Sequence, residues 1–187
     1  MAAMPMPRNL RLAWHRADRE VLAALALVGL VLAGLGAGLH AVFRQQDAAR
    51  EDARAAEARE LECLARNVYF EARGEPEAGQ YAVAEVTMNR KGAARYPDTV
   101  CAVVHQKNWD PLRGRHVGAF SWTEFDVLPA PRGEEWARAR KVAEDVYFRR
   151  VAPRLQGAMY FHASYIKPAW AKEKKAVARI GRHVFYR

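Results

Sequence analysis

The sequence predicts an α+β protein, mainly helical with a small antiparallel sheet, preceded by one membrane-spanning helix. Three observations support this: an apolar run at residues 21–43, helix-spaced apolar residues in several later stretches, and short extended runs near the C-terminus. The chain has 187 residues, of which 51% are hydrophobic and 27% are charged. This length and composition provide for one folded domain plus a short extra segment and argue against general disorder.

The part of the chain before residue 61 divides into three segments. Residues 1–20 are rich in Met and Pro, and we expect a disordered tail. Residues 21–43 contain no Asp, Glu, Lys or Arg, and as a helix they would span about 35 Å, enough to cross a membrane. The run is longer than the apolar core of a cleaved signal peptide, so we predict an uncleaved anchor. Residues 44–60 combine Ala with charged residues and predict a solvated helical stalk.

The folded domain is expected at residues 61–187, and its elements follow from local signals. Gly74 offers a stop for a first helix, Pro76 a start for a second, and Thr99 an N-cap for a third. The long segment 107–133 is rich in Gly, Pro and Trp without a clear period, which predicts a long loop with short strands. The expected elements are helices at 61–75, 77–90, 100–106 and 134–150, and short extended runs within 157–187.

Glu71 is the residue that stands out in the first helix of this domain. Leu64 and Val68 mark its apolar stripe, and at 100° per residue Glu71 falls about 20° from Leu64 and about 60° from Val68. A carboxyl group among apolar neighbours is expected to have a raised pKa, which is what a general acid needs. The alternative is a Glu at a helix end that forms a salt bridge with Arg66 or Arg73.

Charge and cysteines restrict the function without choosing it. The net charge of +9 resides in residues 63–187, since the preceding segments nearly cancel each other. Such a surface suits nucleic acid, a lipid surface or an anionic cell-wall glycan. Cys63 and Cys101 are the two cysteines; a reducing compartment would leave them free, whereas an oxidising one favours a disulfide.

Five blocks that occur in order along the domain carry a family resemblance. They are NVYFEARGE at 67–75, AVAEVTMNR at 82–90, YPDTVCAVVHQ at 96–106, FSW at 120–122, and GAMYFHA…PAW…RIGRHVFYR at 157–187. Together they resemble the SleB/CwlJ-type cell-wall hydrolases, which include spore-cortex-lytic enzymes. This chain departs from the family pattern at Ala119, where relatives often have Gln, and at TEFD in 123–126.

The resemblance implies a lysozyme-like fold and cleavage of peptidoglycan between N-acetylmuramic acid and N-acetylglucosamine. The family's catalytic Glu corresponds to Glu71, which implies a lytic transglycosylase with one general acid/base and 1,6-anhydro products. The alternatives are a hydrolytic muramidase that uses water, and a non-catalytic membrane-anchored wall-binding protein. We expect no cofactor and no metal site, because His162 and His183 lack a ligand-spaced set around them. Nucleic-acid binding is disfavoured by the anchor and by the lack of a recognisable motif.

Six further residues are candidates for substrate binding: Tyr160, His162, Ser121, Trp122, Arg73 and Glu75. Aromatic rings stack on sugars, and hydroxyl or imidazole groups hydrogen-bond to them. Core packing is the alternative for Tyr160 and Trp122, and a surface ion pair is the alternative for Arg73. Glu75 would lie beside Glu71 rather than across a scissile bond, which favours a structural role or tuning of Glu71 by like charge.

The family resemblance also implies a location. An enzyme that acts on the wall must face it, so we expect a single-pass protein of the bacterial inner membrane. Its N-terminus would be cytoplasmic and its domain periplasmic or facing the wall, which favours a Cys63–Cys101 disulfide. The expected partners are peptidoglycan strands and the membrane, and Gly34 and Gly38 form a G-x-x-x-G that can support weak self-association of the anchor.

Overall fold

The computed structural model describes residues 8–187 except 112 and 156, and the chain divides between Ala53 and Arg54 into two compact units. Helix α1 comprises Arg8–Ala72. The expected disordered tail at 1–20 is therefore helical from Arg8 onward, and the remainder of that expectation, residues 1–7, lies outside the described residues. The helix can continue toward the N-terminus because extending a formed helix adds a hydrogen bond per residue without a new nucleation cost.

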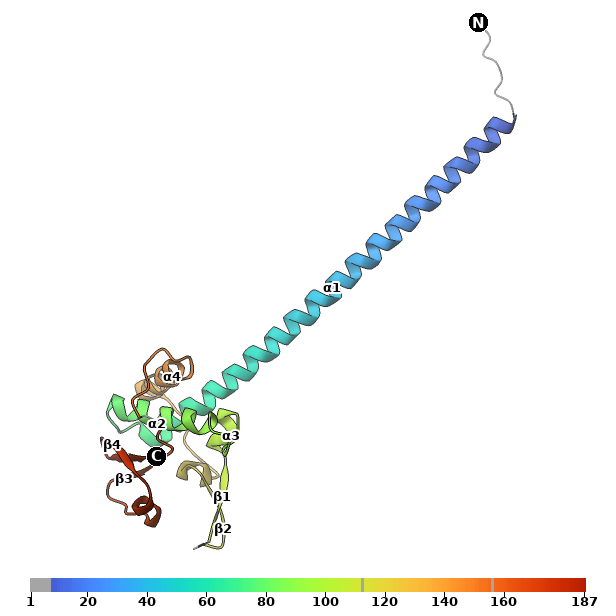
Figure 1. The fold of residues 1–187 in the computed structure, drawn as a ribbon. Helices are drawn as coiled ribbons and strands as arrows, with labels where there is room; N and C mark the ends of the chain where they lie inside the picture. Colours follow the sequence, from blue (N-terminus) through green and yellow to red (C-terminus); the bar gives the residue numbers. More distant parts are fainter. Residues whose placement is uncertain (1–7, 112, 156) are drawn as a thin grey trace. The chain divides into compact units, whose positions relative to one another are not determined.

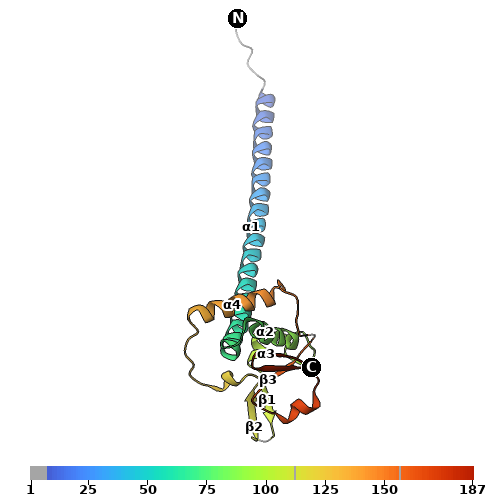
Figure 2. The ribbon, with the colours of Figure 1, turned by 90° about the vertical axis from the view of Figure 1, so that its left-hand side faces the viewer.

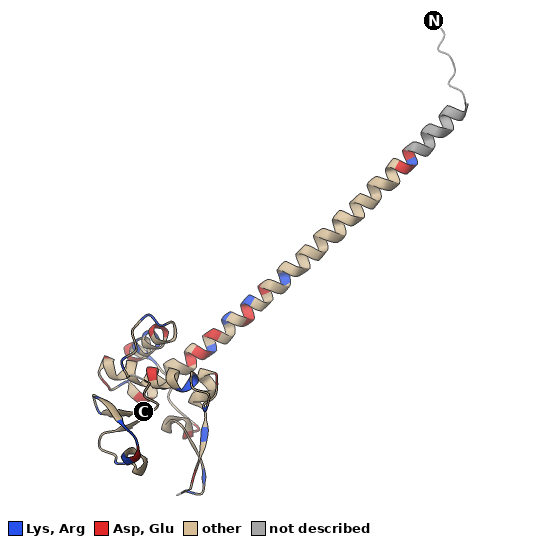
Figure 3. Cartoon of the chain, viewed as in Figure 1, with Lys and Arg blue, Asp and Glu red and all other residues tan. Residues whose placement is uncertain are grey.

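The apolar segment of the first unit has the properties of a membrane-spanning helix in length and composition. Its side chains are open to the surroundings, with Leu22 65% and Leu30 71% exposed. Figure 3 shows this stretch free of charged residues, with charged residues before and after it. In the stalk that follows, Asp47 and Arg50 form one of the expected pairs at 3.6 Å.

The second unit contains the remaining helices and two antiparallel sheets (Figure 1). The helices are α2 (Glu77–Lys91), α3 (Val100–Val104) and α4 (Gly133–Tyr147), with 3-10 helices η1 (Ser121–Glu124) and η2 (Ala169–Glu173). The strands are β1 (Lys107–Asp110), β2 (Arg115–Gly118), β3 (Tyr160–Ala163), β4 (Ala176–Ile180) and β5 (His183–Tyr186). The mainly helical α+β class is thus confirmed, with two small sheets rather than one.

The sheets are short and strictly antiparallel. Strands β1 and β2 form a hairpin in which Trp109 pairs with His116. The other sheet has the order β3-β5-β4, with Phe161 opposite Phe185 and Arg179 opposite Val184. The short extended runs expected within 157–187 therefore include two neighbouring strands, β3 and β5.

Helix α2 lies at the centre of the unit and contacts α3, α4 and β4. Figure 2 shows α4 on one side of α2 and the β3-β5-β4 sheet on the other. The last turns of α1 contribute Leu64 and Val68 to one buried cluster, which includes Trp122 and Val142. A second buried cluster contains Ala72, Val83, Val86, Leu155 and Phe185. The apolar face predicted for 61–75 is therefore the face that holds this helix end in the core.

Helix α3 has its own N-cap and is fixed against α1 by two further features. Thr99 caps α3, because its side chain accepts a hydrogen bond from the N–H of Ala102 at 3.2 Å. The carboxylate of Glu60 accepts the N–H groups of Val100 and Cys101. The disulfide joins Cys63 to Cys101 across 38 residues, so the expected pairing is present.

Candidate active site

Glu71 lies in the last turn of α1, one residue before the helix ends at Ala72. Its neighbours on the helix face, Val68 and Ala72, are buried, and Glu71 itself is half-buried. The oxygen Oε1 is fully buried and has no hydrogen-bond partner among the described residues. A buried carboxyl oxygen without a hydrogen-bond donor favours the protonated form of the side chain, because the charge of the ionised form would be poorly compensated there.

Burial raises the pKa of Glu71 to about 7. Three groups act against this rise: the hydroxyl of Ser121, the charge of Arg90, and the backbone N–H groups of Ser121 and Trp122. Desolvation outweighs them, so near neutral pH the side chain exchanges a proton readily. The sequence left open a salt bridge from Glu71 to Arg66 or Arg73. The cation that interacts with Glu71 is instead Arg90 of α2.

Ser121 and Trp122 reach Glu71 because they begin η1, directly after the β1–β2 hairpin. The Trp122 side chain is held in the core: its indole N–H donates to Asn67 Oδ1 at 2.8 Å, and its ring stacks on Phe70. Asn67 in turn donates to Thr87 Oγ1 at 3.0 Å. The prediction that Trp122 stacks on sugar is therefore wrong, because only 6% of the residue is exposed. Ser121 is exposed and remains a candidate.

Arg90 interacts electrostatically both with Glu71 and with Tyr96 and Tyr160. Its Nε donates to the Met159 carbonyl at 2.8 Å, and its guanidinium lies over the Phe120 ring, 5.0 Å from the centroid. Burial lowers the pKa of Arg90, while Tyr96, Tyr160 and Glu71 raise it. A cation fixed by a carbonyl and an aromatic ring supplies constant positive charge beside the acid.

Glu75 is bound to a different part of the chain. Its Oε1 accepts Arg182 Nε and its Oε2 accepts Arg182 N–H, both at 2.8 Å. These bonds lower the pKa of Glu75 although burial acts to raise it. Gly181 has φ +57, and a Cβ there would lie 2.9 Å from Cδ of Pro76 and closer still to Glu75, so only glycine fits this turn. Both oxygens of Glu75 accept hydrogen bonds from Arg182, which favours the structural role over substrate binding.

Tyr160 and His162 lie on β3, and both are half-buried. His162 Nδ1 donates to the Ala163 carbonyl at 2.9 Å, and Nε2 lies 2.8 Å from the Tyr186 hydroxyl. Trp170 of η2 packs edge-on against His162 and tilted against Tyr160, with centroids 5.6 and 5.8 Å apart. The two predicted residues thus share one aromatic cluster, and His162 can meet a ligand through its ring rather than its nitrogens.

Arg73 does not point to Glu71. Its Nη1 donates to the Tyr69 hydroxyl at 3.2 Å, and the guanidinium lies 5.1 Å from that ring's centroid. The residue is exposed, and its contact is with a ring of the same helix.

Tyr96, Trp170 and Lys174 were not predicted as site residues. The only sequence signal for them was the aromatic content of the loops around Tyr96 and Trp170.

The described side chains include no group of His, Cys, Asp and Glu that would hold a metal ion.

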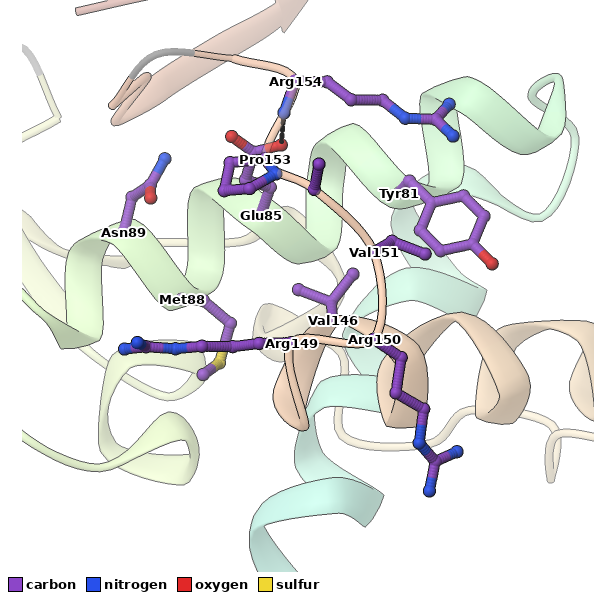
Figure 4. A pocket seen from close by; sticks show the side chains of 11 residues that line it. Tyr81, Glu85, Met88, Asn89, Val146, Arg149, Arg150, Val151, Pro153 and Arg154 are labelled. Atoms are coloured by element: carbon purple, nitrogen blue, oxygen red, sulfur yellow. Dashed lines mark hydrogen bonds between the residues drawn. The ribbon is translucent and has the colours of Figure 1, made fainter.

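A cavity of about 520 Å³ lies beneath the segment after α4, between Met88 and Val151. Figure 4 shows its arginines, Arg149, Arg150 and Arg154, extending in different directions. Neither Glu71 nor any residue that lowers its pKa lines this cavity, so it is separate from the site.

Comparison with known proteins places the chain in a family. The spore cortex-lytic enzyme of Oceanobacillus iheyensis is 28% identical over 67% of this chain and 41% of its own length. That of Halalkalibacterium halodurans is 31% identical over 67% of this chain and 34% of its own length. The chain therefore spans well under half the length of these relatives.

Solved structures give the same result. The catalytic domain of the germination-specific lytic transglycosylase SleB from Bacillus anthracis has a TM-score of 0.53 and 27% identity, covering 68% of this chain and 93% of that domain. The catalytic domain of Bacillus cereus SleB has a TM-score of 0.53 and 26% identity, over 68% and 89%. The Cell Wall Hydrolase family model matches residues 74–186, a range that begins three residues after Glu71. The chain belongs to the cell wall hydrolase family.

Proposed function

We propose that this protein cleaves peptidoglycan glycan strands between N-acetylmuramic acid and N-acetylglucosamine as a lytic transglycosylase, with Glu71 as its one general acid and base. The observation that carries the proposal is the carboxyl of Glu71, whose pKa burial raises to about 7 and whose Oε1 has no partner among the described residues. The similarity to a domain described as a lytic transglycosylase supports the reaction class. Because the family match begins after Glu71, the role of this residue rests on its geometry.

The reaction needs one proton carrier. Protonated Glu71 gives its proton to the glycosidic oxygen as the bond to C1 of the muramic acid breaks, through an oxocarbenium-like transition state. The 6-hydroxyl of the same sugar then attacks C1 and returns its proton to the Glu71 carboxylate. The products are a 1,6-anhydro end and a free N-acetylglucosamine 4-hydroxyl, and no water is consumed. Glu75 is committed to Arg182, so it is not available as a second catalytic carboxylate.

The groups around Glu71 assist the step in which it becomes negative. Ser121, the N–H of Trp122 and the charge of Arg90 all favour the ionised carboxylate. They therefore stabilise the charge that develops when the proton moves to the sugar oxygen. Their opposition to burial places the pKa near neutrality, where Glu71 can both give and take a proton.

The remaining contacts and the location complete the proposal. Tyr160, His162 and Ser121 are proposed to bind the sugars, because Ser121 interacts with Glu71 and Tyr160 interacts with Arg90, which in turn interacts with Glu71. Residues 21–43 are proposed to anchor the protein in the inner membrane, with a cytoplasmic N-terminus and the second unit facing the wall. The length and apolar composition of the helix support the anchor, and the Cys63–Cys101 disulfide supports an oxidising compartment.

The test is product analysis of purified sacculi incubated with the detergent-solubilised full chain. We expect anhydro-muropeptides, which weigh one water less than products with reducing ends. Reducing ends would instead identify a hydrolytic muramidase. The absence of any cleavage by a folded, disulfide-bonded chain would contradict both enzymatic functions and leave a wall-binding protein.

A further inference from the structure

Beyond the catalytic carboxyl, three segments bring two cations onto one tyrosine pair. The guanidinium of Arg95 lies 5.2 Å from the centroid of the Tyr96 ring and 5.6 Å from that of Tyr160. Lys174 Nζ lies 4.0 Å from the centroid of the Tyr160 ring. These residues come from the turn after α2, from β3 and from the end of η2. We refer to Arg95, Tyr96, Tyr160 and Lys174 as the cationic cluster.

The two cations of this cluster have no carboxylate partner in the part of the chain that the structure describes. Several cations of the domain are paired, such as Arg115 with Glu124, Lys141 with Asp145 and Arg182 with Glu75, whereas Arg95 and Lys174 lie together on one ring without such a partner in the residues described. Arg95 is exposed and Lys174 is half-buried, so both can be reached from solvent. Two like charges held on one ring without a counter-ion favour an added anion.

Tyr160 lies between the two cations. Tyr96 lowers the pKa of the Tyr160 hydroxyl, and the charges of Arg95 and Lys174 lower it further, against the effect of burial. A phenol has one donor position. Tyr160 can therefore donate its proton to an acceptor such as a carboxylate oxygen that the two cations attract.

The cluster adjoins the proposed catalytic acid through Arg90. This buried guanidinium interacts electrostatically with Glu71, and also with Tyr96, Tyr160 and Arg95. A sugar whose glycosidic bond lies at Glu71 would therefore place its substituents toward the cluster. Muramic acid is the sugar of the strand that carries a carboxyl-bearing substituent, either its lactyl group or the peptide joined to it.

We propose that Arg95, Lys174 and Tyr160 form a subsite that binds a carboxylate carried by the muramic acid residue of the strand. The inference rests on the proposed function for its ligand, and it adds the part of the substrate that the enzyme recognises. The subsite orients the muramic acid relative to Glu71 and takes no part in the proton transfer. Arg95 and Lys174 are two of the positive charges that make up the basic surplus of the domain, and the subsite gives these two a function.

The test measures binding rather than cleavage, in a full-length Glu71→Gln chain in mild detergent. Sedimentation with sacculi compares native carboxylates with carboxylates converted to amides by carbodiimide and ammonia. We expect about tenfold weaker binding to the amidated sacculi, and a ratio close to one for Arg95→Gln/Lys174→Gln. The matched control, Arg138→Gln/Arg140→Gln on α4, removes the same charge from exposed residues and should keep the tenfold ratio.

A third variant and a third substrate sharpen the result. Tyr160→Phe removes only the hydroxyl, and it should reduce the preference two- to threefold while Arg95 and Lys174 remain. Where muramic acid carries a peptide, its lactyl carboxyl is already an amide, so the carboxylates that amidation removes there are those of the peptide. Strands freed of peptide by an amidase carry the lactyl carboxylate alone. Binding to these strands that depends on Arg95 and Lys174 shows that the subsite also accepts the lactyl carboxylate, and loss of binding shows that it requires a peptide carboxylate.

Two results would overturn the subsite: equal binding of the starting chain to native and amidated sacculi, or equal loss in the cluster and control variants. Each variant is first shown to be folded by circular dichroism. Failure of the proposed function would appear separately, as absence of cleavage by the chain with Glu71 intact while the binding ratio persists.

Discussion

Glu71 and Glu75 lie four residues apart near the same end of α1, and their surroundings move their pKa values in opposite directions. On the side facing η1 and α2, burial raises the pKa of Glu71 to about 7. On the side facing the β4–β5 turn, Arg182 lowers the pKa of Glu75. The two carboxyl groups therefore differ near neutral pH: Glu71 can be protonated there, whereas the lowered pKa of Glu75 favours its ionised form.

The difference lies in how many partners each oxygen has. Both oxygens of Glu75 accept hydrogen bonds from Arg182, so the charged form is satisfied and tied to the sheet. One oxygen of Glu71 is buried with no partner in the described chain. Burial therefore raises the pKa of a carboxyl group only where it outweighs the donors present, as it does for Glu71 and does not for Glu75.

The largest effect is expected on catalysis by Glu71. Glu71→Gln keeps the shape of the side chain but has no proton to transfer, so cleavage of sacculi should fall by roughly a thousandfold or more. Release of anhydro-muropeptides by the detergent-solubilised full chain measures this. Glu75→Gln is the matched control and should retain activity at temperatures where it is folded. Retention of more than a tenth of the activity by Glu71→Gln would remove this residue from the mechanism.

The next effect is on stability and concerns Glu75. Replacement by Gln leaves Arg182 without its anion and should lower the free energy of unfolding by about 2 kcal/mol at pH 7. Because the folded-state pKa of Glu75 is lowered, its contribution is complete above the unfolded value and disappears as pH falls through the folded value. Denaturant unfolding at pH 7 and pH 3 should show a larger cost at pH 7 than at pH 3. An equal cost at both values would mean that packing, not charge, is lost.

The sequence placed Glu71 correctly on the buried side of its helix because helical periodicity is a local property. It could not separate the roles of Glu71 and Glu75, because the decisive partner, Arg182, lies 107 residues away. Trp122 was misassigned for the same reason: the buried acceptor of its N–H is Asn67, 55 residues earlier. Class, helices and caps follow from nearby residues, whereas partners across the fold do not.

An effect of opposite sign is expected for the stability of the Glu71 variant. An unfolded Glu ionises near 4.5, whereas folded Glu71 does so at about 7, so between these values the folded state holds the additional proton. Stability contributed by this group falls as pH rises through that range and is lowest above 7. Glu71→Gln should therefore be more stable than the original chain by up to roughly 3 kcal/mol at pH 8 and about equal to it at pH 4. A destabilised variant at pH 8 would indicate that the carboxylate is structurally paired, like Glu75.

The smallest effect tests the balance that sets the pKa of Glu71. The hydroxyl of Ser121 lowers this pKa, so Ser121→Ala should raise it and move the alkaline limb of kcat/KM upward by less than one pH unit. The maximal rate should fall as well, because the same hydroxyl stabilises the carboxylate formed when the proton leaves. Ser164→Ala, in the turn after β3, is a control that should leave the limb in place. A limb that moves down, or a rate that falls with no movement, would show that Ser121 contacts the sugar rather than Glu71. In that case the pKa of Glu71 would be set by burial, Arg90 and the backbone N–H groups of Ser121 and Trp122, without the Ser121 hydroxyl.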